Sequence, residues 1–125
     1  MSPPLTDQAL LREGVEVAPV EVCDSRASRR RGLLGRDGIG WALLLPSTSS
    51  VHTVGMRFAI DVAYCDRDLV VVRTATMRPN RLGRPTLHAR AVIEAEAGAF
   101  ARWGLAVGDH LAVRSPGESP ENVGR

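Results

Sequence analysis

Long apolar runs are missing from this sequence. The clean run Ala42–Leu45 has only four residues, whereas a helix needs about 18 apolar residues to cross a bilayer. The chain also does not open on a charged and then apolar export signal. These absences argue against a membrane-spanning helix and predict a soluble protein of the cytoplasm, with no membrane partner.

Cysteine and aromatic residues are scarce. The two cysteines, Cys23 and Cys65, are too few for a disulfide scaffold, and their spacing fits neither a C-x-x-C redox motif nor a zinc site. In the cytoplasm we expect both to remain thiols. Aromatic residues make up only 4% of the chain, so stacking platforms for single-stranded nucleic acid are few. Nucleic acid is therefore an unfavoured partner.

Lysine is absent as well, and all 16 basic side chains are arginine. Arginine keeps its charge and can bind a carboxylate or a phosphate through two parallel hydrogen bonds, so this composition is compatible with an anionic partner. The 14 acidic residues are interleaved with the arginines, however, and the net charge is only +2. The densest cluster, Arg29–Arg31 with Arg36, is expected near the end of a helix, where the helix dipole favours positive charge.

A chain of 125 residues is long enough for one domain that buries about two-thirds of the surface of the extended chain. Both ends are rich in proline, serine, glycine and charge without periodicity, which is typical of flexible termini. We therefore predict a flexible segment over residues 1–13, a single β-rich domain over 14–114 and a flexible tail over 115–125.

Alternation of apolar and polar residues predicts most of the secondary structure. The clearest case is 56–65, where the even-numbered residues are large and apolar and the odd-numbered ones are small or polar, as expected of a half-buried strand. The turn Asp66–Asp68 then leads into a strand over 69–74 and completes a hairpin. The other expected strands span 14–23, with an irregularity at Pro19, and 41–45, 87–96 and 107–114.

Two short helices are also expected. One begins at Asp24 or Ser25 and runs to about Leu34, and the other spans 98–103 and is closed by Gly104. Five or more strands at short spacing with little helix indicate a mainly β fold. We predict a compact antiparallel β-sandwich or partly closed barrel with one or two short helices.

Several ordered motifs together resemble a known family, the domain-of-unknown-function family 192. They are Gly32–Arg36, His52–Val62, Arg78–Pro79, Val92–Glu94, Ala97–Gly98 and Gly108–Asp109. The resemblance covers nearly all of 15–113 and implies a compact β-rich protein of about this length. It implies no settled activity, substrate or catalytic set.

A group of polar residues around the strand 56–65 is the main candidate site. His52, Thr53 and Arg57 are suited to hold an anionic or polar ligand, with Asp61 or Glu94 orienting His52 as a base. The alternative is structural, in that His52 and Thr53 satisfy loop backbone groups and Asp61 pairs with buried donors. His88, Arg90 and Glu94 are expected on an exposed sheet face as ordinary cross-strand charge pairing.

The loop Met77–Pro85 is the second candidate surface. It carries Arg78, Arg81 and Arg84 and has no evident structural role, and loops of this length are frequent recognition sites. No metal site is predicted, because the possible ligands are dispersed along the chain. They are His52, His88, His110, Cys23, Cys65 and a few acids. No cofactor is predicted either.

These observations favour a noncatalytic binding or accessory module that presents His52–Arg57 and Met77–Pro85 to an unknown protein or to a small polar or anionic ligand. The alternative is a small enzyme or small-ligand-binding barrel with a polar pocket around His52, Asp61 and Glu94. A buried and already paired Asp61, with no cavity beside His52, argues against that alternative.

Overall fold

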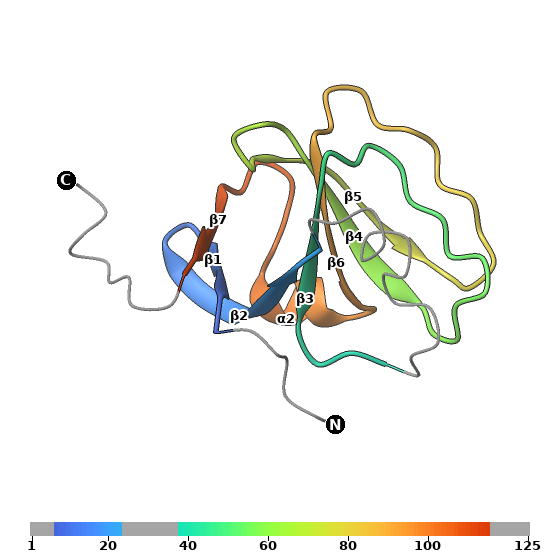
Figure 1. Ribbon diagram of the computed structural model, residues 1–125, viewed down its shortest axis with the longest axis horizontal. Coiled ribbons are helices and arrows are strands. Elements are labelled where there is room, and N and C mark those ends of the chain that lie inside the picture. The colour runs from blue at the N-terminus through green and yellow to red at the C-terminus, as the bar shows by residue number, and fades with distance from the viewer. Residues whose placement is uncertain (1–6, 24–37, 116–125) are drawn as a thin grey trace.

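The strands form where β-branched and other apolar residues cluster between turns. In the computed structural model, which describes residues 7–23 and 38–115, one seven-stranded sheet has the order β5-β4-β6-β3-β2-β1-β7 (Figure 1). The mainly β fold predicted from the sequence is confirmed. The elements are β1 (Ala9–Arg12), β2 (Val15–Val22), β3 (Ala42–Pro46), β4 (Ile60–Cys65), β5 (Val71–Met77), β6 (Ala91–Glu96), the short helix α2 (Ala99–Trp103) and β7 (Leu111–Arg114).

One strand pair departs from the antiparallel arrangement that the sequence predicts. β2 and β3 run parallel, with Val20 opposite Ala42 and Val22 opposite Leu44, whereas every other ladder of the described sheet is antiparallel. Parallel neighbours require a long crossover, and the stretch 23–41 between these two strands supplies it. The expected helix from Asp24 or Ser25 to Leu34, and the cluster of Arg29–Arg31 with Arg36, lie outside the described residues.

The sheet curls until its two edge strands touch at one end. An isolated bridge joins Val70, just before β5, to His110, just before β7. The Val71 amide donates to the Asp109 carbonyl oxygen at 2.9 Å, and the Gly108 amide donates to the Val71 carbonyl oxygen at 2.8 Å. These contacts do not continue along β5, so the sheet is a partly closed barrel rather than a closed one.

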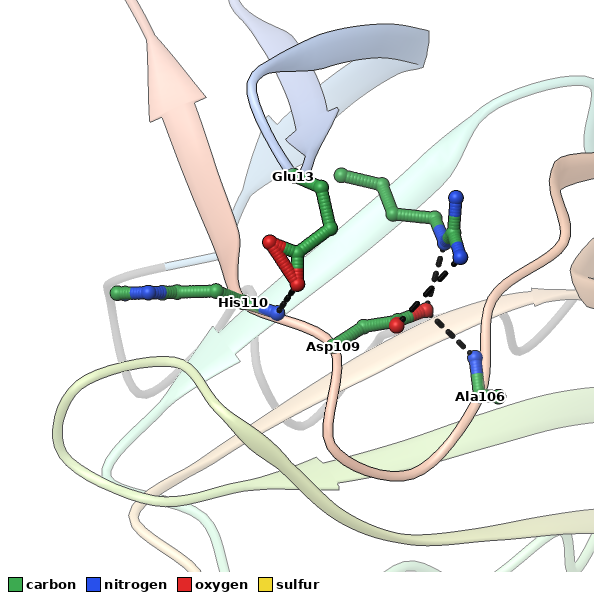
Figure 2. Close-up of polar contacts among 5 residues, drawn as sticks. Glu13, Ala106, Asp109 and His110 are labelled. Atoms are coloured by element: carbon green, nitrogen blue, oxygen red, sulfur yellow. Dashed lines mark hydrogen bonds and ion pairs between the residues drawn. The ribbon is translucent and has the colours of Figure 1, made fainter.

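Asp109 and Glu13 fasten the turn before β7 to the end of β1 (Figure 2). The Asp109 carboxylate accepts hydrogen bonds from Arg12 Nε at 2.6 Å and from the Ala106 amide at 2.8 Å. The Glu13 carboxylate accepts one from the His110 amide at 3.1 Å. The hydrogen bond from Arg12 is the main reason why the pKa of Asp109 is lowered. Residues 9–12 are thus an ordered strand, whereas the sequence predicts flexibility over 1–13.

Both faces of the central strands are buried. Ile60, Val62 and Tyr64 of β4 pack into one core cluster, and Ala63 and Cys65 pack into a second cluster on the opposite face. The apolar side of β4 therefore faces inward as predicted, but the small and polar side is buried too, and the strand begins at Ile60 rather than Met56.

β6 is likewise buried rather than half-exposed. Glu94 is 6% exposed, so the prediction that it shares an exposed face with His88 and Arg90 is wrong. The reason is that this face of β6 is covered by the core, because Glu94 lies opposite Leu43 and Val62, which belong to one of the core clusters. The helix predicted over 98–103 is present as α2, and Gly104 ends it in the left-handed conformation, with φ 69°.

Candidate functional site

Two loops that the sequence analysis selected separately lie side by side. The Gly83 amide donates to the Val51 carbonyl oxygen at 2.8 Å, and the Thr53 amide donates to the Arg81 carbonyl oxygen at 2.8 Å. Between them, His52 and Leu82 form a β-bridge. Residues 51–56 and 78–83, called the paired loops below, therefore form one structural unit.

Thr53 is the anchor of the paired loops. Its side chain is fully buried, and its hydroxyl donates to the Arg78 carbonyl oxygen at 2.5 Å while accepting from the Arg81 amide at 2.9 Å. The Thr53 carbonyl oxygen accepts from the Asn80 amide at 2.7 Å. Thr53 therefore holds the arginine-bearing loop in place, in line with the structural alternative given for it.

Asn80 completes the turn of this loop. It has a positive φ of 62°, a conformation that asparagine tolerates better than most residues. Its side-chain oxygen accepts a hydrogen bond from the Gly55 amide at 2.9 Å. The loop 77–85 is therefore a built structure with a defined backbone, and its arginines are carried on a fixed frame.

Four arginines surround one cleft beside the paired loops. The cleft has a volume of about 420 Å³ and is lined by Arg73 of β5 and by Arg78, Arg81 and Arg84 of the loop, with Tyr64 of β4 among the other lining residues. No acidic side chain occurs among the described residues that line it. We call this the arginine cleft. Positive charge therefore gathers around it, and the buried Glu94 carboxyl group acts on the lining residue Tyr64 from within the sheet.

Tyr64 and Arg73 form the inner wall of the arginine cleft. Tyr64 is 1% exposed, and the guanidinium carbon of Arg73 lies 5.1 Å from the centre of its ring, within the range of a cation–π contact. Arg73 also donates to Thr86 Oγ1 at 3.1 Å. Burial raises the pKa of Tyr64, and the charge of Arg73 opposes that rise. The tyrosine therefore stays a neutral hydroxyl at physiological pH.

Arg78, Arg81 and Arg84 are all exposed, but only Arg81 is braced by its own loop. Arg81 Nη1 lies 3.3 Å from the Pro79 carbonyl oxygen, to which it donates. For Arg78 and Arg84, no side-chain hydrogen bond or ion pair occurs within the described part of the chain. These two guanidinium groups are available to an anion.

Asp61 has a structural role on the other face of the sheet. It is 5% exposed, and its carboxylate accepts hydrogen bonds from Thr76 Oγ1 at 2.8 Å and from the amides of Gly98 and Phe100 at 3.0 and 3.1 Å. The carboxylate thus satisfies the first amides of α2, which otherwise have no partner within the helix. The structural alternative considered for Asp61 is the one that the geometry supports.

His52, Asp61 and Glu94 do not meet in one pocket. His52 is exposed and accepts a hydrogen bond from the Val54 amide at 3.3 Å. Glu94 lies opposite Val62 in the sheet register, so its side chain occupies the face opposite to that of Asp61. The cleft that Asp61 lines includes neither His52 nor Glu94. The geometric basis for a catalytic pocket around them is therefore lacking.

Glu94 is a buried carboxyl group within the sheet. Burial raises its pKa to about 7, because removal from water disfavours the charged form. Arg57 lies on the exposed surface before β4, outside the residues that line the arginine cleft. Of the six predicted site residues, only Arg78 lines that cleft. Thr53 holds the backbone of Arg78 in place through a hydrogen bond to its carbonyl oxygen.

The sequence did not predict that Tyr64 and Arg73 belong to the candidate site. Cys65 pairs with Val71, so in a regular hairpin Tyr64 would pair with Val72. The register shifts between Tyr64 and Cys65, however, and Tyr64 pairs with Arg73 instead. This bulge moves Arg73 to the tyrosine side of the sheet. Strand parity alone contains no signal for it.

Comparison with known proteins assigns the fold and family but no activity. The model of the DUF192 family, described as "Uncharacterized ACR", matches residues 9–113. A UPF0127 protein of Thermococcus sibiricus is 29% identical over 120 residues, which cover 84% of this chain and 78% of the relative.

Two solved structures share the fold. One is a protein of unknown function from Novosphingobium aromaticivorans, with a TM-score of 0.71 and 18% identity over 84% of this chain and 82% of that one. The other, a proposed transcription regulator from Sinorhizobium meliloti, has a TM-score of 0.74 and 17% identity over 90% of this chain and 98% of that one. At these identities the likeness concerns the fold alone. Among the described residues, no helix is long and apolar enough to span a bilayer.

Proposed function

We propose that this chain, which belongs to the uncharacterised DUF192 family, is a noncatalytic binding module that holds a polar anionic ligand in the arginine cleft. The observation that carries the proposal is the convergence of Arg73, Arg78, Arg81 and Arg84 on one cleft. Guanidinium groups bind carboxylates and phosphates through paired hydrogen bonds, and several around one cleft reinforce each other.

The frame behind the arginines supports this function. The loop that carries Arg78 and Arg81 is fastened by the buried Thr53 and by Asn80, so little loop ordering is needed on binding. A preorganised site binds more tightly because less conformational entropy is lost. The walls contribute a tyrosine ring and the apolar parts of Met77 and Leu82, which suits a ligand with both charged and carbon-containing parts.

Binding of small anions tests the proposal. Isothermal titration with inorganic pyrophosphate and with citrate, at low salt, measures the dissociation constant for the wild type and for a double variant, Arg78→Gln with Arg84→Gln. Because both arginines are exposed, the double variant is expected to fold normally, and we expect it to bind each anion at least about tenfold more weakly. The affinity should also fall as salt is raised.

A matched control removes the same amount of charge elsewhere. Arg67 and Arg102 are exposed and line other parts of the surface, so Arg67→Gln with Arg102→Gln should retain the wild-type affinity. Equal losses in both double variants would show a general charge effect and contradict a specific cleft. Failure of both anions to bind the wild type at millimolar concentration would overturn the proposal.

A cytoplasmic location stays part of this proposal. Cys23 and Cys65 are both buried thiols, and they belong to the two different core clusters. Thiols that do not form a disulfide are typical of proteins in reducing compartments, which supports the location expected from the sequence.

A further inference from the structure

We propose that the ligand of the arginine cleft is an extended acidic peptide that adds to the edge of β5 as a further strand. This inference rests on the function proposed above and names the class of partner. The main evidence is the position of the free edge of β5. It lies between two clefts, namely the arginine cleft on one face of the sheet and a second cleft on the other face.

The edge of β5 is open beyond its first residue. Val71 is occupied, because its backbone groups pair with Gly108 and Asp109. Beyond Val71, the outer edge of β5 has no further backbone partner within the described part of the chain. Open strand edges bind extended peptides by main-chain hydrogen bonds.

The register identifies the backbone groups that are free. The carbonyl oxygens of Ala59 and Cys65 accept hydrogen bonds from residues next to the two ends of β6. Alternate residues of a strand direct their backbone groups to the same edge. Asp61 and Ala63, which lie between them in alternation, therefore also direct their backbone groups toward β6. Their partners on β5 are Thr76 and Thr74. The amides and carbonyls of these two threonines therefore point away from β4.

Two clefts flank this edge. The arginine cleft lies on the face of Tyr64, and a second cleft of about 420 Å³ lies on the face of Asp61, where Phe100 and Leu105 of the α2 region contribute apolar wall. Ala75 and Thr76 line both clefts. An occupant that reaches both must therefore cross the edge of β5.

An added strand fits this arrangement because its side chains alternate between faces. Carboxylates at every second position would lie against the arginines, and small apolar side chains at the intervening positions would lie against Phe100 and Leu105. A small anion could fill only one of the two clefts. The combination of free backbone, one cationic cleft and one partly apolar cleft therefore favours an acidic peptide of alternating pattern.

The experiment uses a capped nonapeptide of alternating glutamate and valine, titrated into the full chain. Two control peptides carry backbone N-methyl groups, one peptide on the odd-numbered residues and the other on the even-numbered residues. The methyl groups leave the charge unchanged, but in each peptide they block the hydrogen bonds along one edge of the added strand. We expect at least one methylated peptide to bind at least tenfold more weakly than the parent. Hydrogen exchange at the Thr74 and Thr76 amides should slow when the parent peptide binds.

Two variants separate the contributions. Arg78→Gln with Arg84→Gln should weaken both the peptide and pyrophosphate at least tenfold. Thr74→Pro removes an outward amide that β4 does not use, a substitution that edge strands tolerate, and it should weaken the peptide tenfold while leaving pyrophosphate unchanged. Unchanged exchange at Thr74 and Thr76 in the wild type would overturn strand addition even if the proline variant failed to fold.

The outcomes distinguish this inference from the function on which it rests. If pyrophosphate binds but both methylated peptides bind as well as the parent, strand addition is wrong and the anion-binding module stands. If neither pyrophosphate nor the peptide binds the wild type, both proposals fail.

Discussion

Thr53 and Arg81 exchange two hydrogen bonds across the paired loops. The Thr53 amide donates to the Arg81 carbonyl oxygen at 2.8 Å, and the Arg81 amide donates to the Thr53 hydroxyl at 2.9 Å. Thr53 also reaches the Arg78 carbonyl oxygen. One buried hydroxyl thereby fixes the backbone from which two arginines of the cleft extend.

Replacing Thr53 by valine should destabilise the protein and weaken anion binding. Valine keeps the shape but removes the hydroxyl, which leaves the Arg81 amide and the Arg78 carbonyl without that partner, at a cost of about 1–3 kcal/mol. Urea unfolding measures the loss, and pyrophosphate titration measures the effect on the cleft. Thr53→Ser retains the hydroxyl and should lose less than half as much; equal losses would show that the methyl group contributes as much as the hydroxyl.

Replacing Gly83 by alanine should disturb the same frame by steric contact. A Cβ at this position would lie 2.5 Å from the Val51 carbonyl oxygen and 3.2 Å from the Tyr64 hydroxyl oxygen. Since backbone must move to relieve the first contact, we expect a loss of about 1–3 kcal/mol in the free energy of unfolding. The neighbouring Leu82→Ala is the control, because Leu82 is 80% exposed and its truncation should change stability little. A Gly83→Ala protein as stable as the wild type would contradict the close approach of these loops.

Replacing Asp61 by alanine should reduce stability without abolishing anion binding. The substitution removes the acceptor for Thr76 and for the first amides of α2, and we expect a loss of about 2–4 kcal/mol. Thr76→Val removes one of these three bonds and should cost about 1 kcal/mol. At a temperature where the Asp61→Ala chain is still folded, pyrophosphate should bind it as it binds the wild type. Loss of binding by the folded variant would return Asp61 to the functional site.

The stability of the protein should decrease as the pH rises toward neutrality because of Glu94. Its pKa is about 7 in the folded chain and near 4.3 in an unfolded one, so the folded state binds the proton more tightly. The free energy of unfolding therefore falls between about pH 4.5 and 7. One pKa unit corresponds to about 1.4 kcal/mol, which makes the total about 4 kcal/mol.

Glu94→Gln tests this contribution because glutamine does not titrate. Urea unfolding at several pH values should show a shallower decline for the variant than for the wild type between pH 4.5 and 7. The comparison uses the slopes and not the absolute stabilities, since a buried amide has hydrogen-bonding needs of its own. Parallel slopes would mean that the Glu94 carboxyl group is ionised as easily in the folded chain as in the unfolded one.

The candidate site could be predicted from the sequence only in part. The loop 77–85 was predicted as a surface because loops with charged residues and no evident structural role are frequent binding surfaces, and the segment 52–57 because its polar side chains suit an anionic or polar ligand. Their hydrogen-bonded pairing through Thr53 joins residues more than 20 positions apart, and no local pattern reports such a contact. The same limit applies to Asp61. The sequence pattern around an aspartate in a strand is the same whether its carboxylate binds a ligand or accepts hydrogen bonds from a helix that is distant in sequence.

Local alternation determined where the chain forms strands, because side-chain direction along a strand is a property of neighbouring residues. It predicted the β4–β5 hairpin, the inward side of β4 and the short helix that Gly104 ends. The tertiary structure alone decided the faces and the partners. Both sides of β4 and β6 are buried because a core cluster covers each face of these strands, and one extra residue at the bulge turns Arg73 toward Tyr64. Pairing register depends on the free energy of many distant contacts at once, so the arginine cleft exists only in the folded chain.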